Sequence, residues 1–254
     1  MRVVQINTVF GDGSTGRTTK ELHNYLMSKK HESFVFYGTG KKSNDANVIL
    51  TQNRFSYLVN NFFGRLLGAE GFLAASSTKK IIKHVRKIKP DVVHLRNLHG
   101  SYINIPKLFN FLAKENVKVV MSLHDLWMLT GKCPSPYLHS CEKWKTGCNH
   151  CPAKKDYPIS WFFDNSKKQF KHKKRSLASL KNNIYIMGVS NWTKTMADSY
   201  PLPLQTGFIY NWIDTELFKP KEQNDTENNS INVLFASAIW EQKSEKFNDL
   251  LQLR

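Results

Sequence analysis

The chain has 254 residues, of which 41% are hydrophobic and 12% aromatic. That share of apolar residues is enough for a packed core, and it excludes a disordered tail or a disulfide-stapled mini-protein. Thirty-seven Lys and Arg against 20 Asp and Glu give a net charge of +17. A charge of this sign favours polyanions, anionic membrane surfaces and phosphorylated substrates as partners.

The N-terminus and the cysteines indicate the cellular compartment. Met1 is followed directly by a short β-branched segment, without the apolar stretch and cleavage site of a signal peptide. No segment has the roughly 18 consecutive apolar residues of a membrane span. We therefore expect a cytoplasmic protein, free or peripheral on the inner face of the plasma membrane, whose four cysteines do not form structural disulfides.

Strand-like and helix-like segments alternate along the chain. Strands are predicted at residues 3–6, 33–37, 92–95, 117–122, 184–188 and 206–210. Helices are predicted at residues 18–29, 54–67, 77–87, 105–114, 165–180 and 191–200. This alternation predicts an α/β fold, with a Rossmann-like parallel sheet, helices on both faces, and every strand after the first buried on both faces. Ligands of such sheets bind beyond the carboxyl ends of the strands.

Composition also predicts the domain organisation. Residues 1–219 are expected to form one Rossmann-like domain, and the polar segment 220–230 is expected to be a linker. Residues 231–254 contain one predicted strand, 233–236, and one predicted helix, 244–253. A lone strand and helix cannot bury both their faces, so this segment is interpreted as the truncated start of a second domain.

A glycine-rich segment follows the first strand. Residues 11–16 fit G-x-G-x-x-G, but a dinucleotide site also needs a carboxylate after the second strand, which ends in Tyr37 and Gly38. A P-loop would need Lys where Arg17 stands. Alternatively, the segment is only a flexible glycine turn that caps a helix and binds no ligand. We predict that an anionic phosphate binds at this helix N-terminus, next to Gly13, Ser14, Thr15, Gly16 and Arg17.

Polar residues follow two of the predicted buried strands. Asn97 and His99 come after strand 92–95, and His124 and Asp125 come after strand 117–122. Such side chains can bind sugar hydroxyls, and one of them could act as a general base. Histidines that are only hydrogen-bonded within the fold are the alternative. The glycine-rich segment beside both strand ends favours a shared site.

These motifs together resemble the family 4 glycosyltransferases of the GT-B fold, especially those that build bacterial surface polysaccharides. The resemblance rests on GSTGR at 13–17, DVVH at 91–94, NLHG at 97–100, LHDLW at 123–127, TG at 130–131, GC at 147–148, CP at 151–152, VSNW at 189–192, NWID at 211–214 and FKP at 218–220. Each motif alone is weak evidence for the family, but the occurrence of all of them in this order along the chain is specific.

The resemblance implies a fold, a reaction and site residues. It implies two Rossmann-like domains, of which the first binds the acceptor and the second most of the nucleotide-sugar. The implied reaction is retaining, hexosyl-type transfer to a saccharide acceptor, expected to be lipid-linked, with no cofactor or metal needed for catalysis. The implied site has His99, His124 and Asp125 as catalytic residues, with Asn97 near the acceptor. One departure is Arg96, where the family commonly has a second His.

The resemblance also bears on the activity of these 254 residues. The carboxylate-bearing donor motif of the family belongs to its second domain and is absent here, so the chain is expected to bind acceptor but to transfer no sugar alone. Two other classes stay open: a basic nucleic-acid-binding protein and a catalytically dead scaffolding domain. No RNA-recognition or helix-turn-helix motif supports nucleic-acid binding.

Four cysteines gather in a loop-like insertion at about residues 130–158. Two of them have C-x-x-C spacing, which lets two thiolates bind one ion, and the other two could complete a tetrahedral site. His139 and His150 are candidate substitute ligands, and free cysteines in a long loop are the alternative to a metal site. Because so long a loop needs stabilisation, we predict a structural zinc ion bound by Cys133, Cys141, Cys148 and Cys151.

The predicted helix 54–67 is strongly amphipathic, with apolar residues at i, i+3, i+4 and i+7. Packing of this stripe on the sheet is the more common arrangement, and insertion into a membrane interface is the other. Basic runs at 79–89 and 167–175 could hold the protein against anionic lipid. That arrangement would suit a lipid-linked acceptor.

Overall fold

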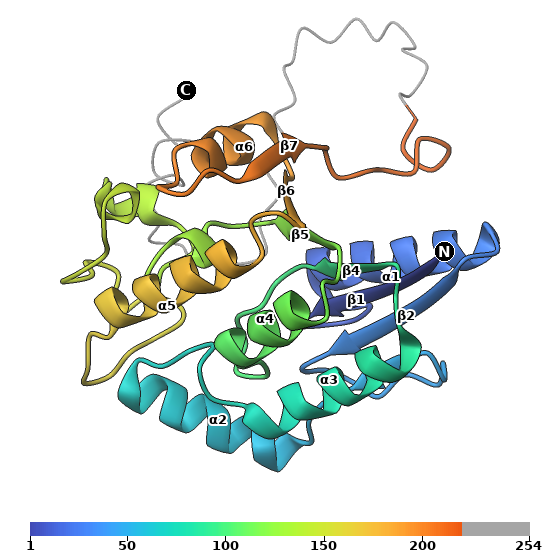
Figure 1. Ribbon diagram of the computed structural model, residues 1–254, viewed down its shortest axis with the longest axis horizontal. Coiled ribbons are helices and arrows are strands. Elements are labelled where there is room, and N and C mark those ends of the chain that lie inside the picture. The colour runs from blue at the N-terminus through green and yellow to red at the C-terminus, as the bar shows by residue number, and fades with distance from the viewer. Residues whose placement is uncertain (220–254) are drawn as a thin grey trace, which may run out of the picture. The chain divides into compact units, whose positions relative to one another are not determined.

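The computed structural model describes residues 1–219, which contain a parallel sheet of seven strands (Figure 1). The strand order is β3-β2-β1-β4-β5-β6-β7, and every neighbouring pair is parallel. The strands are β1 (Arg2–Asn7), β2 (Glu32–Tyr37), β3 (Val48–Leu50), β4 (Val92–Leu95), β5 (Val119–Leu123), β6 (Ile184–Gly188) and β7 (Gln205–Phe208). The α/β fold class and the parallel sheet predicted from the sequence are therefore confirmed.

Helices connect the strands and cover both faces of the sheet (Figure 1). They are α1 (Gly13–Ser28), α2 (Arg54–Leu67), α3 (Ala75–Ile88), α4 (Ile105–Lys114), α5 (Ser166–Ser179) and α6 (Asn191–Asp198). Short 3-10 turns η1 (Trp127–Leu129), η2 (Pro136–His139) and η3 (Lys143–Lys145) lie in or beside the cysteine-containing insertion. None of the helices within residues 1–219 is long and apolar enough to cross a membrane.

The main core lies between the sheet and helices α3, α4 and α5. It contains residues of β1, β2, β4, β5 and β6, including Ile6, Leu95 and Met121, together with Ile81 and Leu108 from the helices. The residues between them in β4, β5 and β6 are only partly buried. A smaller cluster of Val35, Tyr37 and Val48 lies on the face towards α1.

This arrangement corrects the prediction that every strand after the first is buried on both faces. Helix α1 packs on one face of the sheet, where it contacts β1 and β2. On that same face the residues of β4, β5 and β6 are only partly buried. The last strand, β7, lies at the sheet edge, where Gln205 and Phe208 are exposed.

Two other local features differ from the sequence prediction. Strand β3 was not predicted, because a run of three residues carries too little periodicity to detect. Helix α1 begins at Gly13, earlier than the predicted residue 18. Residues 1–212 form one compact unit. The predicted linker 220–230 and the predicted strand and helix within 231–254 lie outside the described residues.

Candidate active site

The candidate site lies where the strand order reverses. Strands β1 and β4 are neighbours in the sheet, although β2 and β3 separate them in the chain. The connections leave these two strands in opposite directions, and such a switch point opens a crevice beyond the carboxyl ends of the strands. The residues that follow β1, β4 and the adjacent β5 are those that the sequence singled out.

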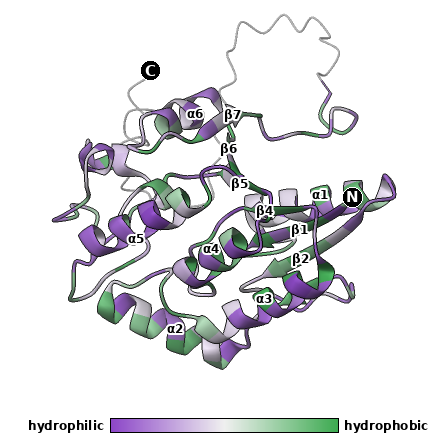
Figure 2. Ribbon diagram, viewed as in Figure 1, coloured by the Kyte–Doolittle hydropathy of each residue, from purple (hydrophilic) through white to green (hydrophobic). Residues whose placement is uncertain are grey.

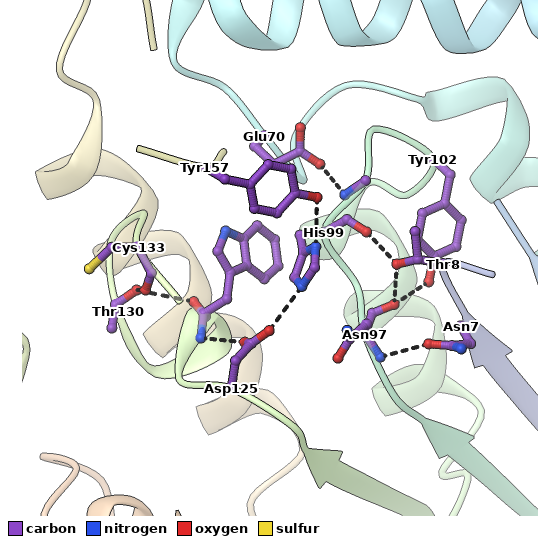
Figure 3. A network of polar contacts seen from close by, with 12 residues as sticks. Asn7, Thr8, Glu70, Asn97, His99, Tyr102, Asp125, Thr130, Cys133 and Tyr157 are labelled. Atoms are coloured by element: carbon purple, nitrogen blue, oxygen red, sulfur yellow. Dashed lines mark hydrogen bonds and ion pairs between the residues drawn. The ribbon is translucent and has the colours of Figure 1, made fainter. Parts of the chain in front are cut away.

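Hydrogen bonds from β1 fix the loop after β4. The buried Asn7 accepts the backbone N–H of Asn97 at 3.1 Å, and the Thr8 hydroxyl donates to the carbonyls of Asn97 at 3.0 Å and His99 at 2.5 Å. The Tyr102 hydroxyl donates to the same Asn97 carbonyl at 2.7 Å. With its backbone held from two sides, Asn97 follows the strand in one defined conformation (Figure 3).

The carboxylate of Glu70, which lies between α2 and α3, binds the backbone of the same loop. Glu70 Oε1 accepts the backbone N–H groups of Gly100 and Ser101 at 2.7 and 2.5 Å, and its Oε2 accepts the Ser101 hydroxyl at 2.7 Å. Gly100 has φ +105°, a conformation that L-residues rarely adopt, and a Cβ there would lie 2.5 Å from Thr8 Cγ2. Glycine and the Glu70 clamp together let the chain turn sharply after His99.

His99 lies between a carboxylate and a phenol. Its Nε2 is 2.9 Å from Asp125 Oδ2, and its Nδ1 is 2.9 Å from the Tyr157 hydroxyl (Figure 3). The ring also makes edge-on contacts with Trp127 and Tyr157, at centroid distances of 5.7 and 5.4 Å. The ionised Asp125 accepts the hydrogen bond of the Nε2–H group, which leaves Nδ1 as the acceptor of a hydroxyl hydrogen bond. The pair is therefore arranged as a carboxylate–imidazole base.

Asp125 is held in its ionised form. Burial alone would raise its pKa, but the hydrogen bond and charge of His99, the Trp127 N–H and the charge of Lys173 lower it below the usual value. The Trp127 backbone N–H donates to Asp125 Oδ1 at 2.8 Å, so both carboxylate oxygens have partners. Below this turn the fully buried Lys173 Nζ donates to the Trp127 carbonyl at 2.7 Å and lies 3.3 Å from the centre of the Trp127 ring.

A buried guanidinium connects the second histidine to α1. Arg96 is 4% exposed, and its NH2 donates to Thr18 Oγ1 at 2.5 Å and to His124 Nε2 at 3.2 Å. Partial burial and the Arg96 charge lower the pKa of His124 to about 4, against a smaller opposing effect of Asp125. His124 is therefore neutral at pH 7, and because its Nε2 accepts from Arg96, its Nδ1 carries the proton. Arg96 sets the tautomer of His124.

The glycine-rich segment forms the bare N-terminus of α1. Asp12 is the N-cap residue but makes no side-chain cap, and no acidic residue occupies the first turn. A Cβ on Gly16 would lie 3.0 Å from Val9 Cγ2 and 3.2 Å from Gly11 N, so this close packing depends on glycine. Backbone N–H groups at a helix N-terminus that have no hydrogen-bond partner within the helix attract anions.

The Arg17 side chain, predicted to contact a phosphate, is directed along α1. The Arg17 side chain is 61% exposed and pairs with Glu21 at 3.5 Å, one helical turn further along α1. Glu21 in turn accepts the Trp212 indole N–H at 2.7 Å. The backbone of Gly13, Ser14 and Thr15 is thus better placed for an anion than the Arg17 guanidinium, whose role in phosphate binding stays a prediction.

The cysteine-containing insertion packs beside the Asp125 loop. The Cys133 and Cys151 thiols share a hydrogen bond, which lowers the pKa of Cys151 to about 7 against the effect of burial. Cys148 Sγ instead accepts the Gly131 N–H at 3.1 Å. Within the described residues no three His, Cys, Asp or Glu side chains are grouped so as to hold a metal ion. The four-thiolate arrangement is not assembled in this structure, and the zinc content of the protein stays a prediction.

The structure brings together most of the predicted strand-end residues and adds two partners. His99 and Asp125 are in direct contact, and His124 reaches α1 through Arg96. Tyr157 and Glu70 were missed by the sequence analysis, because each contacts the His99 loop from a segment 30 or more residues away. A single sequence contains no signal for such long-range contacts.

Known proteins resemble this chain in sequence. The model of Glycosyltransferase Family 4 matches residues 15–217. WcaC of Escherichia coli strain K12, assigned as a colanic acid biosynthesis glycosyl transferase, is 28% identical over 170 residues. That match covers 62% of this chain and 41% of WcaC, so the chain spans about two fifths of the length of this relative.

Solved structures show weaker likenesses. Sucrose-phosphate synthase (tll1590) from Thermosynechococcus elongatus has a TM-score of 0.48 at 10% identity, covering 87% of this chain and 50% of its own. WbmG of Bordetella bronchiseptica, solved with NAD and UDP, has a TM-score of 0.34 at 13% identity, covering 74% of this chain and 52% of its own. These scores add nothing to the topology described above. The family model, by contrast, matches most of the chain and includes both strand ends of the candidate site, and the chain therefore belongs to Glycosyltransferase Family 4.

Proposed function

We propose that residues 1–219 form the acceptor side of a glycosyltransferase that moves a sugar from a nucleotide-sugar to a saccharide acceptor in surface-polysaccharide biosynthesis. The observation that carries this proposal is the His99–Asp125 pair, at 2.9 Å, beyond the carboxyl ends of β4 and β5. The family assignment and the similarity to WcaC support the reaction class.

His99 is proposed to bind the acceptor hydroxyl. Transfer forms a bond between the acceptor oxygen and the anomeric carbon and breaks the bond from that carbon to the diphosphate, which leaves with the electron pair. The hydroxyl proton passes to His99 Nδ1. With Nε2 donating to Asp125, Nδ1 can accept the hydrogen bond of that hydroxyl. The Tyr157 hydroxyl now lies at this nitrogen, so an acceptor hydroxyl would take its place or bind beside it.

His124 and the first turn of α1 are proposed to bind the other polar groups of the substrates. His124 is neutral, and its Nδ1–H can donate to a second acceptor oxygen. The N–H groups of Gly13, Ser14 and Thr15 can stabilise the negative charge that develops on the leaving diphosphate. Both features lie next to the His99 loop, because Arg96 and Asn7 join α1 to the ends of β1 and β4.

The donor is proposed to bind mainly outside the described residues. The resemblance assigns most nucleotide contacts to the second domain of the GT-B fold, and transfer with retention of configuration is carried over as part of that expectation. We expect the 254-residue chain to bind acceptor and to release nucleoside diphosphate from UDP-hexose or GDP-hexose only at the background rate. Release well above background in the presence of acceptor would contradict this assignment of the donor site.

The test of the proposed function is made in cells, with substitutions introduced into the natural gene that contains this sequence, so that the donor side is supplied as it is in the cell. Wild type, His99→Gln and Asp125→Asn are compared, with His31→Gln as the control. His31 precedes β2 at the amino end of that strand, whereas the site lies beyond the carboxyl ends of the strands. We expect cell-surface polysaccharide to be lost with the two site variants at wild-type protein levels, and to be kept with His31→Gln. Normal polysaccharide with stably expressed His99→Gln would overturn the proposal.

A further inference from the structure

Helix α2 is oriented with its polar face towards the protein. The Asn60 side chain donates to Gln52 Oε1 and accepts the Ala74 N–H, both at 3.2 Å. Asn61, the next residue on this face, approaches the Ser101 hydroxyl at 3.5 Å. Gly64 is the only buried residue of the fourteen in α2. An amphipathic helix of a water-soluble domain normally buries its apolar stripe, and α2 does the reverse.

Helix α2 contains many hydrophobic residues (Figure 2), and those of its apolar stripe are exposed to solvent. The exposed fractions are 75% for Phe55, 53% for Leu58, 38% for Val59, 50% for Phe62, 44% for Phe63 and 37% for Leu67. Packing of this stripe on the sheet, the more common arrangement for such a pattern, is therefore wrong here. Single exposed apolar residues are ordinary, but a contiguous stripe of this size indicates an interaction surface.

A second segment extends the same surface. Trp161, Phe162 and Phe163 are 44%, 66% and 56% exposed. The Trp161 N–H donates to the Arg65 carbonyl at 2.8 Å, and the Trp161 and Phe62 rings meet edge-on at 5.6 Å. The loop is thus fixed against α2. We call the six exposed residues of α2 together with residues 161–163 the aromatic surface.

Basic residues lie near both ends of the aromatic surface, and one exposed carboxylate, Asp164, follows Phe163. Arg54 begins α2, and the N-terminus of α5 adjoins its C-terminus, where Asn165 Nδ2 donates to the Leu67 carbonyl at 2.5 Å. Helix α5 contains no acidic residue. Its exposed basic residues are Lys167, Lys168, Lys171 and Arg175. Exposed aromatic rings with a basic rim match the headgroup region of an anionic bilayer, where rings enter the interface and cations bind phosphate.

We propose that the aromatic surface docks this protein on anionic phospholipid membranes. Exposed rings on a helix and an adjacent loop can enter the lipid interface without any change in the fold. The net charge of +17 also favours a lipid surface over a second copy of this chain, which would bring two basic surfaces together.

The position of the surface gives docking a consequence for the candidate site. Tyr157, which contacts His99, lies four residues before Trp161. A hollow of about 510 Å³ lies between Gly38–Gly40 and the first turn of α2, and Leu58 of the aromatic surface lines it. A saccharide carried on a membrane lipid would therefore be presented beside His99 while its lipid stays in the bilayer. This consequence rests on the proposed function, whereas the docking surface itself does not.

The test measures sedimentation of the 254-residue chain with vesicles that contain no saccharide. Vesicles of phosphatidylcholine with phosphatidylglycerol are compared with vesicles of phosphatidylcholine alone. The variants are Phe62→Ser/Phe162→Ser and, as a matched control, Tyr25→Ser, which removes a ring that is 58% exposed on α1. Because all three rings are solvent-exposed, the variants should keep the circular dichroism spectrum and melting temperature of the wild type.

We expect binding to the anionic vesicles, release by high salt, and at least a roughly tenfold weaker partition for the double variant, with Tyr25→Ser within about twofold of wild type. Brominated lipid should quench tryptophan fluorescence in the wild type and less in Trp161→Phe. Equal binding of the double variant, or equal binding to both vesicle types, would overturn the proposal. So would a concentration-dependent dimer that the double variant abolishes. Vesicle binding without saccharide binding at His99 would leave the docking surface standing and contradict the proposed function alone.

Discussion

Replacing Lys173 by Met should change how the stability of the protein depends on pH. The ammonium group is fully buried, with the Trp127 carbonyl at 2.7 Å and the Trp127 ring beneath it. No carboxylate within the described residues lies at salt-bridge distance from it. Burial lowers the pKa of Lys173 from 10.5 to about 7, with smaller opposing effects of Cys148 and Asp125.

The size of the effect follows from this pKa shift. One pKa unit corresponds to about 1.4 kcal/mol, so the charged form of Lys173 is about 5 kcal/mol less favourable in the folded protein than in the unfolded chain. Between pH 7 and 10.5 the unfolded chain holds the proton and the folded protein releases it. Stability therefore rises with pH across this window, by about 2 kcal/mol between pH 7 and pH 9. Lys173→Met removes this contribution, together with the effect of the Lys173 charge on Asp125 and Cys148.

Urea unfolding of wild type and Lys173→Met at pH 7 and pH 9 measures the effect directly. Other titrating groups contribute to both proteins, so the difference between the two free energies of unfolding isolates Lys173. We expect that difference to move by about 2 kcal/mol in favour of the wild type as the pH rises. Free energies of unfolding that change in parallel would show that Lys173 is solvated or paired in solution, and would refute the reasoning.

Three further predictions concern other parts of the molecule. The pKa of His124 is about 4 in the folded protein, against 6.5 in the unfolded chain, so between these pH values only the unfolded chain binds the proton. The wild type should therefore lose stability as the pH falls from 6.5 to 4, and His124→Asn should lose less. Unfolding curves measured at acid pH would show the difference. Gly16→Ala places a Cβ 3.0 Å from Val9 and should lower the free energy of unfolding by about 1 to 2 kcal/mol in urea titrations. Elemental analysis of unchelated protein should find about one zinc per chain, with Cys133→Ser less stable; no zinc in carefully prepared protein, with Cys133→Ser as stable as wild type, would end the zinc hypothesis.

Hydrophobic periodicity predicts the parallel sheet because buried strands and amphipathic helices leave local patterns. Strand β4, which was predicted with the bounds it has, shows this most directly. Strand β7 shows the limit, since nothing in residues 205–208 indicates that they lie at the sheet edge. The orientation of α2 was equally hidden: its stripe is plain in the sequence, but which face the protein contacts depends on distant partners such as Ala74.

The candidate site was predicted in part for a related reason. His99 and Asp125 come directly after strands, and parallel strands bring their carboxyl ends together. Tyr157 lies in an insertion whose path no periodicity predicts, and it reaches His99 across 58 positions. Arg96 was noted as a departure from the family pattern, yet its buried position between Thr18 and His124 became clear only from the structure.

The most direct test of the central claim is binding of a polyprenyl-diphosphate-linked hexose to the 254-residue chain, followed by nuclear magnetic resonance of ¹⁵N-labelled histidine side chains. We expect the resonances of the ring nitrogens of His99 and His124 to shift on binding and those of His31 to stay unchanged. We also expect Asp125→Asn to weaken the affinity by about tenfold through the loss of one charge-assisted hydrogen bond. Saturable binding that leaves the His99 resonances unchanged would mean that the acceptor binds elsewhere on the domain and that His99 is not part of the acceptor site.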